Sequence, residues 1–326
     1  MYLKEIETVI AIAEEKNLTR AAEKLYITPS AVTQQLATLE KYLDTPLFHR
    51  IRGEWTLTPA GEVYVKAGRE MLQLKKQTEQ HIGEIAHYKT GSISVGFPPD
   101  RASEMIQVLY PIFHKKYPNY KMQVREVNVR RQQQMLASGE LDLSFQVLTH
   151  DQRTGDVYIP IALEEILLAA PSFLPQLEAA RPSQYSRFPE LPLTAIQYEP
   201  FAQIYKVSTM RDQTDQIFRD AGIHPEFHFE TSSNHTIVNI VSAGLCCGLV
   251  PDTVAQPTEN VSFFSIPGNP MREIYVCYRK GAFVTRAMED LIEIALATWS
   301  RPSLSVDPKF GTSIPGRAPE SSARSD

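Results

Sequence analysis

The sequence is poor in cysteine and holds no long apolar run, and both absences bear on where the protein works. Its 326 residues contain 3 cysteines, which fits a reducing compartment better than a disulfide-stapled secreted fold. No apolar run approaches the length needed to cross a bilayer. Acidic residues stand close to the N-terminus, where a signal peptide requires a basic patch and an apolar core. We therefore expect a cytoplasmic protein with no membrane association.

Two of the cysteines, Cys246 and Cys247, are adjacent and lie among Ala, Gly and Leu residues. These surroundings favour a packed strand. A redox switch or a metal site is the alternative, although no Cys and His spacing in the chain matches a metal site.

Common catalytic motifs are also absent. The chain contains no G-x-S-x-G, P-loop, H-E-x-x-H or G-x-G-x-x-G pattern. Its carboxylates form no paired arrangement that could be placed in a pocket for acid-base work. We expect neither an enzyme nor a protein that holds a cofactor or metal.

Positive charge is not in excess, as it often is in chains that bind nucleic acid. The formal net charge is -5, and the first 58 residues contain 7 Lys and Arg against 8 Asp and Glu. Any affinity for DNA must then come from the local placement of cations and helix ends, because there is no overall basic field.

The N-terminal segment carries the pattern of three short helices. Apolar residues recur at helical spacing over residues 3–13, which predicts an amphipathic first helix. Asn17 or Thr19 can cap a second helix. After a short turn, Thr28 is a good N-cap and Pro29 a good first residue for a third helix.

The third helix has two different faces. Apolar residues from Val32 to Leu43 recur on one face, and the opposite face is small and polar, with no acid before Glu40. Short hydroxyl and amide side chains let a helix seat in the major groove and bond to base edges. The residues predicted to contact DNA on this helix are Thr28, Pro29, Ser30, Thr33, Gln34, Ala37 and Thr38. A polar face that only keeps the helix soluble is the alternative.

A short hairpin is predicted at residues 51–58, with Gly53 at its tip. Arg50 and Arg52 flank the tip and suit contact with phosphates and the minor groove. The helices and the hairpin together predict a winged helix-turn-helix DNA-binding domain at residues 1–58.

A long linker helix is predicted after the hairpin, over residues 59–89. Thr58 and Pro59 supply a second N-cap and first-turn proline, and the helical pattern runs to about His87. An imperfect heptad seam recurs every seven residues at Tyr64, Met71, Thr78 and Ile85. Such a seam favours a homodimer contact, whereas the alternative is a solvated connecting helix.

Five segments, taken in order, resemble the N-terminal signature of LysR-type transcriptional regulators: residues 17–25, 28–36, 39–40, 46–50 and 57–61. The resemblance implies a winged helix-turn-helix, dimerisation through the linker helix, a homotetramer on a long operator and a contact with RNA polymerase. Two departures stand out. Asp44 occupies a position where Gly is usual, and Asp tolerates the left-handed turn expected there. On the third helix, Thr33 and Gln34 replace the common Ser and Arg.

The remaining chain alternates between strand and helix patterns, which predicts a parallel α/β sheet with helices on both faces. This alternation includes a helix from Pro171 and a strand at Thr194–Ile196. The resemblance implies a two-lobed effector domain, like a periplasmic binding protein, over residues 90–300. Its first lobe would comprise residues 91–160 and 268–298, and its second lobe residues 161–267. Residues 301–326 are rich in Ser, Pro and Gly and predict a disordered tail.

Within this region, Gly139–Asp142 resembles a hallmark of the family. Ligands of open α/β sheets bind beyond the carboxyl ends of strands, where helix N-termini present amide donors. Residues at such positions, or at those that match the family's cleft, are Asp100, Arg101, Ser103, Asn128, Gln146, Gln197, Asn234 and His235. Each can equally be a helix cap or a solvated loop residue. The pattern does not identify the small-molecule effector.

Two functions from different classes fit these observations. The first is a transcription regulator that binds double-stranded DNA and responds to a small molecule. The second is an intracellular solute-binding or enzymatic α/β module whose N-terminal helices serve only assembly. The acid-free face of the third helix and the hairpin arginines favour the first.

Overall fold

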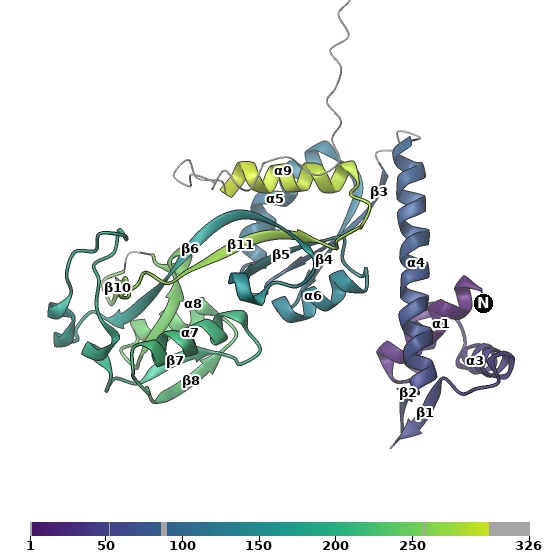
Figure 1. Ribbon diagram of the computed structural model, residues 1–326, viewed down its shortest axis with the longest axis horizontal. Coiled ribbons are helices and arrows are strands. Elements are labelled where there is room, and N and C mark those ends of the chain that lie inside the picture. Colours follow the sequence, from purple (N-terminus) through teal and green to yellow (C-terminus); the bar gives the residue numbers. More distant parts are fainter. Residues whose placement is uncertain (1, 52, 86–89, 257, 300–326) are drawn as a thin grey trace, which may run out of the picture.

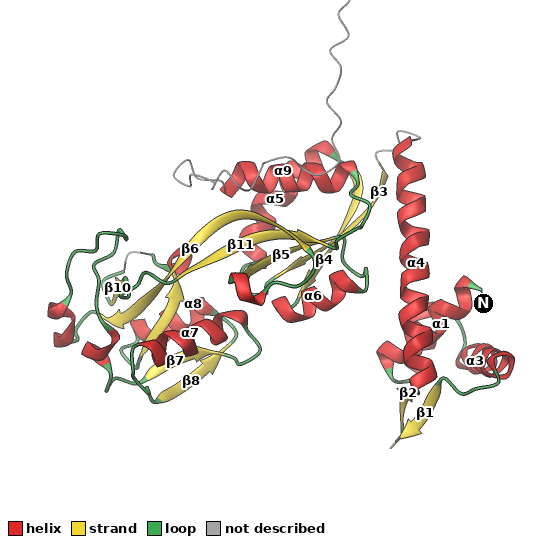
Figure 2. Ribbon diagram, viewed as in Figure 1, coloured by secondary structure: helices red, strands yellow, loops and turns green. Residues whose placement is uncertain are grey.

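The structure is a computed structural model that describes residues 2–51, 53–85, 90–256 and 258–299. A helical N-terminal unit with a small hairpin comes first, and a larger α/β region follows (Figures 1 and 2). Arg52 and the predicted tail at 301–326 lie outside the described residues.

The N-terminal unit is a three-helix cluster followed by a hairpin and a long helix. Its elements are α1 (Leu3–Glu15), α2 (Leu18–Leu25), α3 (Pro29–Leu43), β1 (Phe48–Ile51), β2 (Glu54–Leu57) and α4 (Pro59–Ile85). Asn17, rather than Thr19, caps α2, because its side chain accepts from the backbone N–H groups of Thr19 and Arg20. The fully buried Ala21 and Ala22 bring α2 close to its neighbours. The end predicted for the long helix, near His87, lies outside the described residues.

The first lobe of the α/β region is built on a parallel core. Its elements are β3 (Thr90–Phe97), α5 (Ala102–Lys116), β4 (Asn119–Glu126), α6 (Val129–Ala137) and β5 (Leu143–Leu148), with α9 (Arg286–Trp299) from the end of the chain. β3 pairs in parallel with both β4 and β5. α5 and α9 pack together over one face of the sheet, and α6 covers the other (Figure 1).

The second lobe repeats this layering. Its elements are β6 (Val157–Pro171), β7 (Phe201–Ile204), α7 (Thr209–Asp220), β8 (Phe227–Thr231), α8 (Asn234–Ser242), β9 (Cys247–Pro251) and β10 (Val261–Phe264). The next strand, β11 (Met271–Tyr278), returns to the core of the first lobe. Short 3-10 turns are η1 (His150–Gln152), η2 (Pro175–Ala179), η3 (Leu193–Ile196) and η4 (Asp252–Val254). Separate apolar clusters form beneath α7 and α8.

Two long strands, β6 and β11, connect the lobes. The described strands of both lobes follow the order β4-β3-β5-β11-β6-β9-β7-β8, with β10 added on β6. β11 runs antiparallel to β5 and to β6, and β6 runs antiparallel to β9. The expected parallel pairing is found within each lobe, between β3, β4 and β5 and between β7, β8 and β9, but it is wrong for the crossing strands β6 and β11, which run antiparallel to their neighbours (Figure 2).

Two local expectations in the second lobe are wrong as well. No helix begins at Pro171, which ends β6; the following Pro175 holds Leu174 in an extended conformation, at ψ 123°, and only a 3-10 turn forms. Thr194–Ile196 belongs to the 3-10 turn η3, whose buried Leu193 and Ile196 share one side at a spacing of three residues. The strand lies later, at Phe201–Ile204.

Candidate DNA interface and effector cleft

The outward face of α3 is exposed along its length. Thr28 caps the helix, and the backbone N–H of Ala31 donates to its hydroxyl at 3.2 Å. The buried side chains of α3 are Val32, Leu36 and Leu39, which pack into the N-terminal core. Each residue predicted to contact DNA on this helix is exposed: Thr28, Pro29, Ser30, Thr33, Gln34, Ala37 and Thr38.

Local hydrogen bonds order part of this face. The Thr33 hydroxyl donates to the Pro29 carbonyl at 2.9 Å, and the Thr38 hydroxyl donates to the Gln34 carbonyl at 2.8 Å. Glu40, the first acid on the helix, does not face outward with them. Its Oε1 accepts from the backbone N–H of Leu47 at 2.6 Å. The acid therefore positions the start of the hairpin and leaves the outward face of α3 without negative charge.

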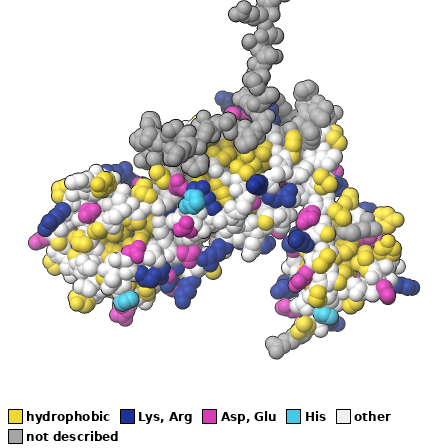
Figure 3. Space-filling model, viewed as in Figure 1, with side chains coloured by type: hydrophobic (Ala, Val, Ile, Leu, Met, Phe, Trp, Pro, Cys, Tyr) yellow, Lys and Arg dark blue, Asp and Glu magenta, His cyan; other side chains and the backbone are white. Residues whose placement is uncertain are grey.

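The hairpin is fixed to the helices at both ends. β1 and β2 pair antiparallel, and Gly53 at the tip has φ 89°, a value that favours glycine. The Trp55 N–H donates to the Lys16 carbonyl at 3.1 Å, which ties the hairpin to the end of α1. Arg50 is exposed on β1. Basic and acidic side chains are interspersed over the visible face of this unit (Figure 3).

The long helix α4 carries an exposed apolar stripe. Val63, Met71, Leu74 and Ile82 are 70%, 46%, 65% and 60% exposed. At about 100° per residue these four positions fall within roughly 100° of one another. Tyr64, by contrast, is 7% exposed and belongs to the N-terminal core, so the heptad seam predicted through Tyr64 is wrong at that position.

A cavity of about 350 Å³ lies between the two lobes. Four of the residues predicted as effector contacts line it: Asp100, Arg101, Asn128 and Asn234. Asn128 also caps α6, where its Oδ1 accepts from the Arg131 N–H at 2.9 Å. The cavity is further lined by residues that the pattern did not single out: Arg131, Tyr205, Ser208, Thr209 and Arg272. Ser208 could have been found, since Ser directly before a helix is a common N-cap and Ser208 caps α7.

The other four predicted residues lie away from the cavity. Gln197 follows the turn η3 instead of a strand and is exposed elsewhere. Ser103 is exposed on α5, and His235 lies 3.2 Å from Glu104 on the outer surface. Gln146 is fully buried, because its side chain points under α6 and donates to Ser144 at 2.9 Å. Its neighbour Val147 faces the cavity, as alternation along a strand requires.

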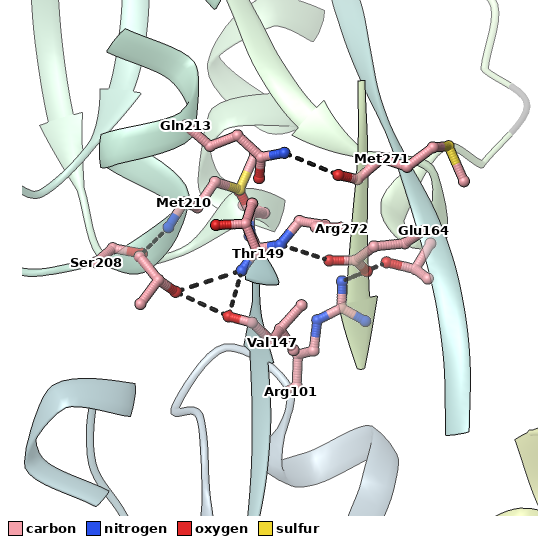
Figure 4. Close-up of polar contacts among 12 residues, drawn as sticks. Arg101, Val147, Thr149, Glu164, Ser208, Met210, Gln213, Met271 and Arg272 are labelled. Atoms are coloured by element: carbon pink, nitrogen blue, oxygen red, sulfur yellow. Dashed lines mark hydrogen bonds and ion pairs between the residues drawn. The ribbon is translucent and has the colours of Figure 1, made fainter. Parts of the chain in front are cut away.

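Three buried charged residues lie together at one side of the cavity, which Arg101 and Arg272 line and Glu164 does not. Arg101, Glu164 and Arg272 are 8%, 1% and 6% exposed. Arg101 pairs with Glu164 and donates to Thr253 at 2.9 Å, while Nε of Arg272 lies 3.2 Å from the other oxygen of Glu164 (Figure 4). The buried carboxylate of Glu164 thus forms ion pairs with two guanidinium groups.

Arg272 also connects the lobes. Its Nη2 donates to the Val147 carbonyl at 2.7 Å, and the Thr209 hydroxyl of the second lobe donates to the same carbonyl at 2.8 Å (Figure 4). Burial lowers the pKa of Arg272; the Glu164 charge opposes this effect and the Arg101 charge adds to it. Glu164 therefore stabilises the charged form of this buried guanidinium.

Three further contacts bridge the lobes around the cavity. Asn234 Nδ2 donates to Asp100 Oδ2 at 2.7 Å, Arg130 pairs with Asp212 at 2.7 Å, and Gln152 donates to the Thr209 carbonyl at 3.0 Å. Asn234 is 4% exposed, and in the described part of the chain its Oδ1 has no hydrogen-bond partner. Because a carboxylate only accepts, Asp100 fixes which end of the Asn234 amide is the oxygen.

The adjacent cysteines are packed, as their surroundings predict. Cys246 and Cys247 are buried and unbridged. Burial raises the pKa of Cys247 to about 12 and also raises the pKa of Cys246. Both thiols are therefore protonated at neutral pH, which disfavours a redox role, since the thiolate is the reactive form. Among the described residues, no group of three or more His, Cys, Asp or Glu side chains could hold a metal ion, and no helix is long and apolar enough to cross a membrane.

Comparison with known protein families assigns both parts of the chain. The model described as "Bacterial regulatory helix-turn-helix protein, lysR family" matches residues 3–62, and that described as "LysR substrate binding domain" matches residues 86–300. The chain belongs to the LysR family. It is a DNA-binding transcription regulator with an effector domain, and the winged helix-turn-helix and two-lobed α/β architecture are as expected. LysR-family regulators bind DNA, form oligomers and are generally not enzymes.

Relatives and solved structures match this LysR-family chain over most of its length and most of their own. The uncharacterized regulator YcgK of Bacillus subtilis is 26% identical over 90% of this chain and 94% of its own length. The dual regulator OxyR of Escherichia coli is 24% identical over 90% and 94%. A full-length OxyR variant from Pseudomonas aeruginosa has a TM-score of 0.65 at 20% identity, covering 92% and 97%. CbnR in complex with its target DNA has a TM-score of 0.58 at 20% identity, covering 91% and 99%.

Proposed function

We propose that this regulator reads its operator with the outward face of α3 in the major groove, while Arg50 and Arg52 of the hairpin contact the adjoining backbone and minor groove. The observation that carries the proposal is the exposed face of α3 on which no acid points outward. The amide of Gln34 lies in the middle of that face and suits bidentate contact with an adenine. Arg50 stands on the neighbouring hairpin, where a cation meets phosphates.

A homodimer forms through the apolar stripe of α4. The stripe lies on the side of α4 opposite Arg69, Gln73 and Lys76, the residues that face the chain's own effector domain. The partner that fits this stripe is α4 of a second copy of the chain, because two helices with the same apolar stripe can bury it against each other. Two such dimers make the homotetramer that spans a long operator.

The effector is a small molecule that binds in the cavity between the lobes. The residues placed to contact it are Asp100, Arg101, Asn128, Arg131, Tyr205, Ser208, Thr209, Asn234 and Arg272. They come from both lobes, so a ligand bound there changes the relative free energy of open and closed lobes. This change alters operator bending and contact with RNA polymerase, and the protein acts in the cytoplasm where that DNA lies.

A footprint on the DNA upstream of the chain's own gene tests the DNA-reading proposal. The wild-type protein should protect two half-sites, and Gln34→Ala should lose protection at particular base pairs. Gln107→Ala is the matched control, because Gln107 is also an exposed helical glutamine but lies on α5. An identical loss from both variants, or a complex with wild type that is insensitive to DNA sequence, would show that α3 does not read bases.

The competing function, an α/β module whose helices serve only assembly, predicts that α3 packs against another protein surface. In that case the seven exposed residues of its outward face would be covered in the oligomer. Protection of Gln34 from solvent in the free oligomer, measured by hydrogen exchange of residues 29–43, would favour this second function.

A further inference from the structure

The turn Gly139–Asp142, which stands out in the sequence, is the place where the effector domain holds the linker helix. Nζ of Lys76 on α4 donates to both carboxylate oxygens of Asp142 at 2.8 Å. Asp142 Oδ2 also accepts from the backbone N–H of Ser94 on β3 at 2.7 Å. Gly139 has φ 74° and faces the Gln73 side chain. The turn therefore fixes α4 to the first lobe.

Glu140, in the same turn, lies between two arginines. Its Oε1 is 4.0 Å from Nη2 of Arg69 on α4, and its Oε2 is 3.6 Å from Nη2 of Arg131 on α6. Arg131 lines the effector cavity. One carboxylate thus faces the cavity wall on one side and the linker helix on the other.

Arg69 continues the row of alternating charges into the DNA-binding unit. The same Nη2 donates to Oε1 of Glu14 on α1 at 3.1 Å. The other oxygen of Glu14 accepts from Lys24 on α2 at 2.8 Å. The order Arg131, Glu140, Arg69, Glu14, Lys24 therefore leads from the cavity to the helix-turn-helix.

These pairs are suited to exchange. The side chains of Arg69, Glu140 and Arg131 are 29%, 27% and 47% exposed, so each pair is weak and none is locked by burial. Nε of Arg69 is buried and, among the described residues, has no partner. If the Glu140 carboxylate leaves Arg131, the Nε–H of Arg69 can donate to it. Glu14 and Glu140 then compete for the Arg69 guanidinium.

The cavity indicates which ligand would cause this exchange. Arg131 offers a cation at its edge, and the buried Oδ1 of Asn234, without a partner in the described chain, offers an acceptor. We propose that the effector carries an anionic group and an N–H or O–H donor, that its anion takes Arg131 from Glu140, and that Glu140 then draws Arg69 away from Glu14. The proposal rests on the proposed function, because it requires the cavity to be the effector site.

Hydrogen exchange on the full-length chain tests the relay without DNA. Arg131→Gln mimics an occupied Arg131, so amides of residues 13–25 should exchange about threefold faster than in wild type, within the range of one exposed ion pair. In a Glu140→Gln background the same substitution should have no effect. Arg131→Lys should resemble wild type. Arg219→Gln removes an equal charge from α7, where the Arg219 side chain bonds to Gln216, and should change nothing at residues 13–25.

Inorganic phosphate, which carries both an anion and an O–H donor, is the probe for the ligand class. Compared with sodium chloride at equal ionic strength, it should speed exchange of residues 13–25 in wild type and have no effect in Arg131→Gln. If Arg131→Gln acts equally with and without Glu140, the relay is overturned. If the relay responds to Arg131→Gln but phosphate and chloride are equivalent, the anionic class is overturned. Failure of the wild-type footprint would instead overturn the proposed function and leave these exchange results standing.

Discussion

Replacing Glu164 with Gln should destabilise the effector domain strongly. Glu164 is 1% exposed and is the carboxylate that both Arg101 and Arg272 approach. Glutamine has nearly the same shape and can still accept one hydrogen bond, so packing is preserved. The substitution removes the charge and leaves two guanidinium groups buried beside each other.

The size of the effect follows from that burial. Breaking a buried ion pair by removing one partner costs about 3–5 kcal/mol, because an uncompensated charge stays out of water. For a domain of about 150–250 residues, 1 kcal/mol corresponds to a shift in Tm of about 2–4 °C, so the expected loss is roughly 6–20 °C. The residual hydrogen bond from Arg101 places the result toward the lower end of this range.

Thermal unfolding followed by circular dichroism measures the shift, and a urea titration checks it at constant temperature. The matched control is Glu104→Gln, because Glu104 is half exposed and pairs with the exposed His235. That change should cost less than about 1 kcal/mol. Equal Tm values for Glu164→Gln and Glu104→Gln would refute the reasoning, since the two arginines would then not depend on Glu164.

Further outcomes follow from the DNA-binding unit and the linker helix. Gln34→Ala should cost about 1–3 kcal/mol at particular base pairs, whereas Arg50→Ala should weaken binding to all sequences and lower the salt slope by about 1; competition binding at several salt concentrations distinguishes them. Leu74→Glu should dissociate the dimer in sedimentation equilibrium, while Leu245→Glu, at a similarly exposed leucine of the effector domain, should not. Gly61→Ala should destabilise the N-terminal unit by at least about 1–3 kcal/mol in urea, because the new Cβ would lie 2.1 Å from a backbone carbonyl oxygen; an unchanged midpoint would contradict that close approach.

The N-terminal unit was predictable because its signals are local. Thr28 and Pro29 mark the start of α3, and the structure begins the helix at Pro29. Caps and first-turn prolines act within four residues, so they can be read without knowing the fold. The same logic located the start of α4 at Pro59.

The cavity was only partly predictable, because its chemistry depends on distant contacts. Arg272 comes from β11, near the end of the chain, and meets Glu164 of β6 only after the two strands cross. No spacing in the sequence indicates that meeting. Gln197 was misplaced for a related reason: short apolar runs such as Leu193–Ile196 do not distinguish a strand from a 3-10 turn.

The crossing of β6 and β11 has a consequence for synthesis on the ribosome. The N-terminal unit is complete once α4 has emerged, since its core uses only residues before that helix ends. The first lobe must wait for β11 and α9, because residues from Ile274 to Ala295 belong to its core. Domains fold in the order in which their residues become available. A growing chain therefore completes its DNA-binding unit long before its sensor, and a message truncated ahead of α9 would yield a DNA binder that cannot respond to its signal.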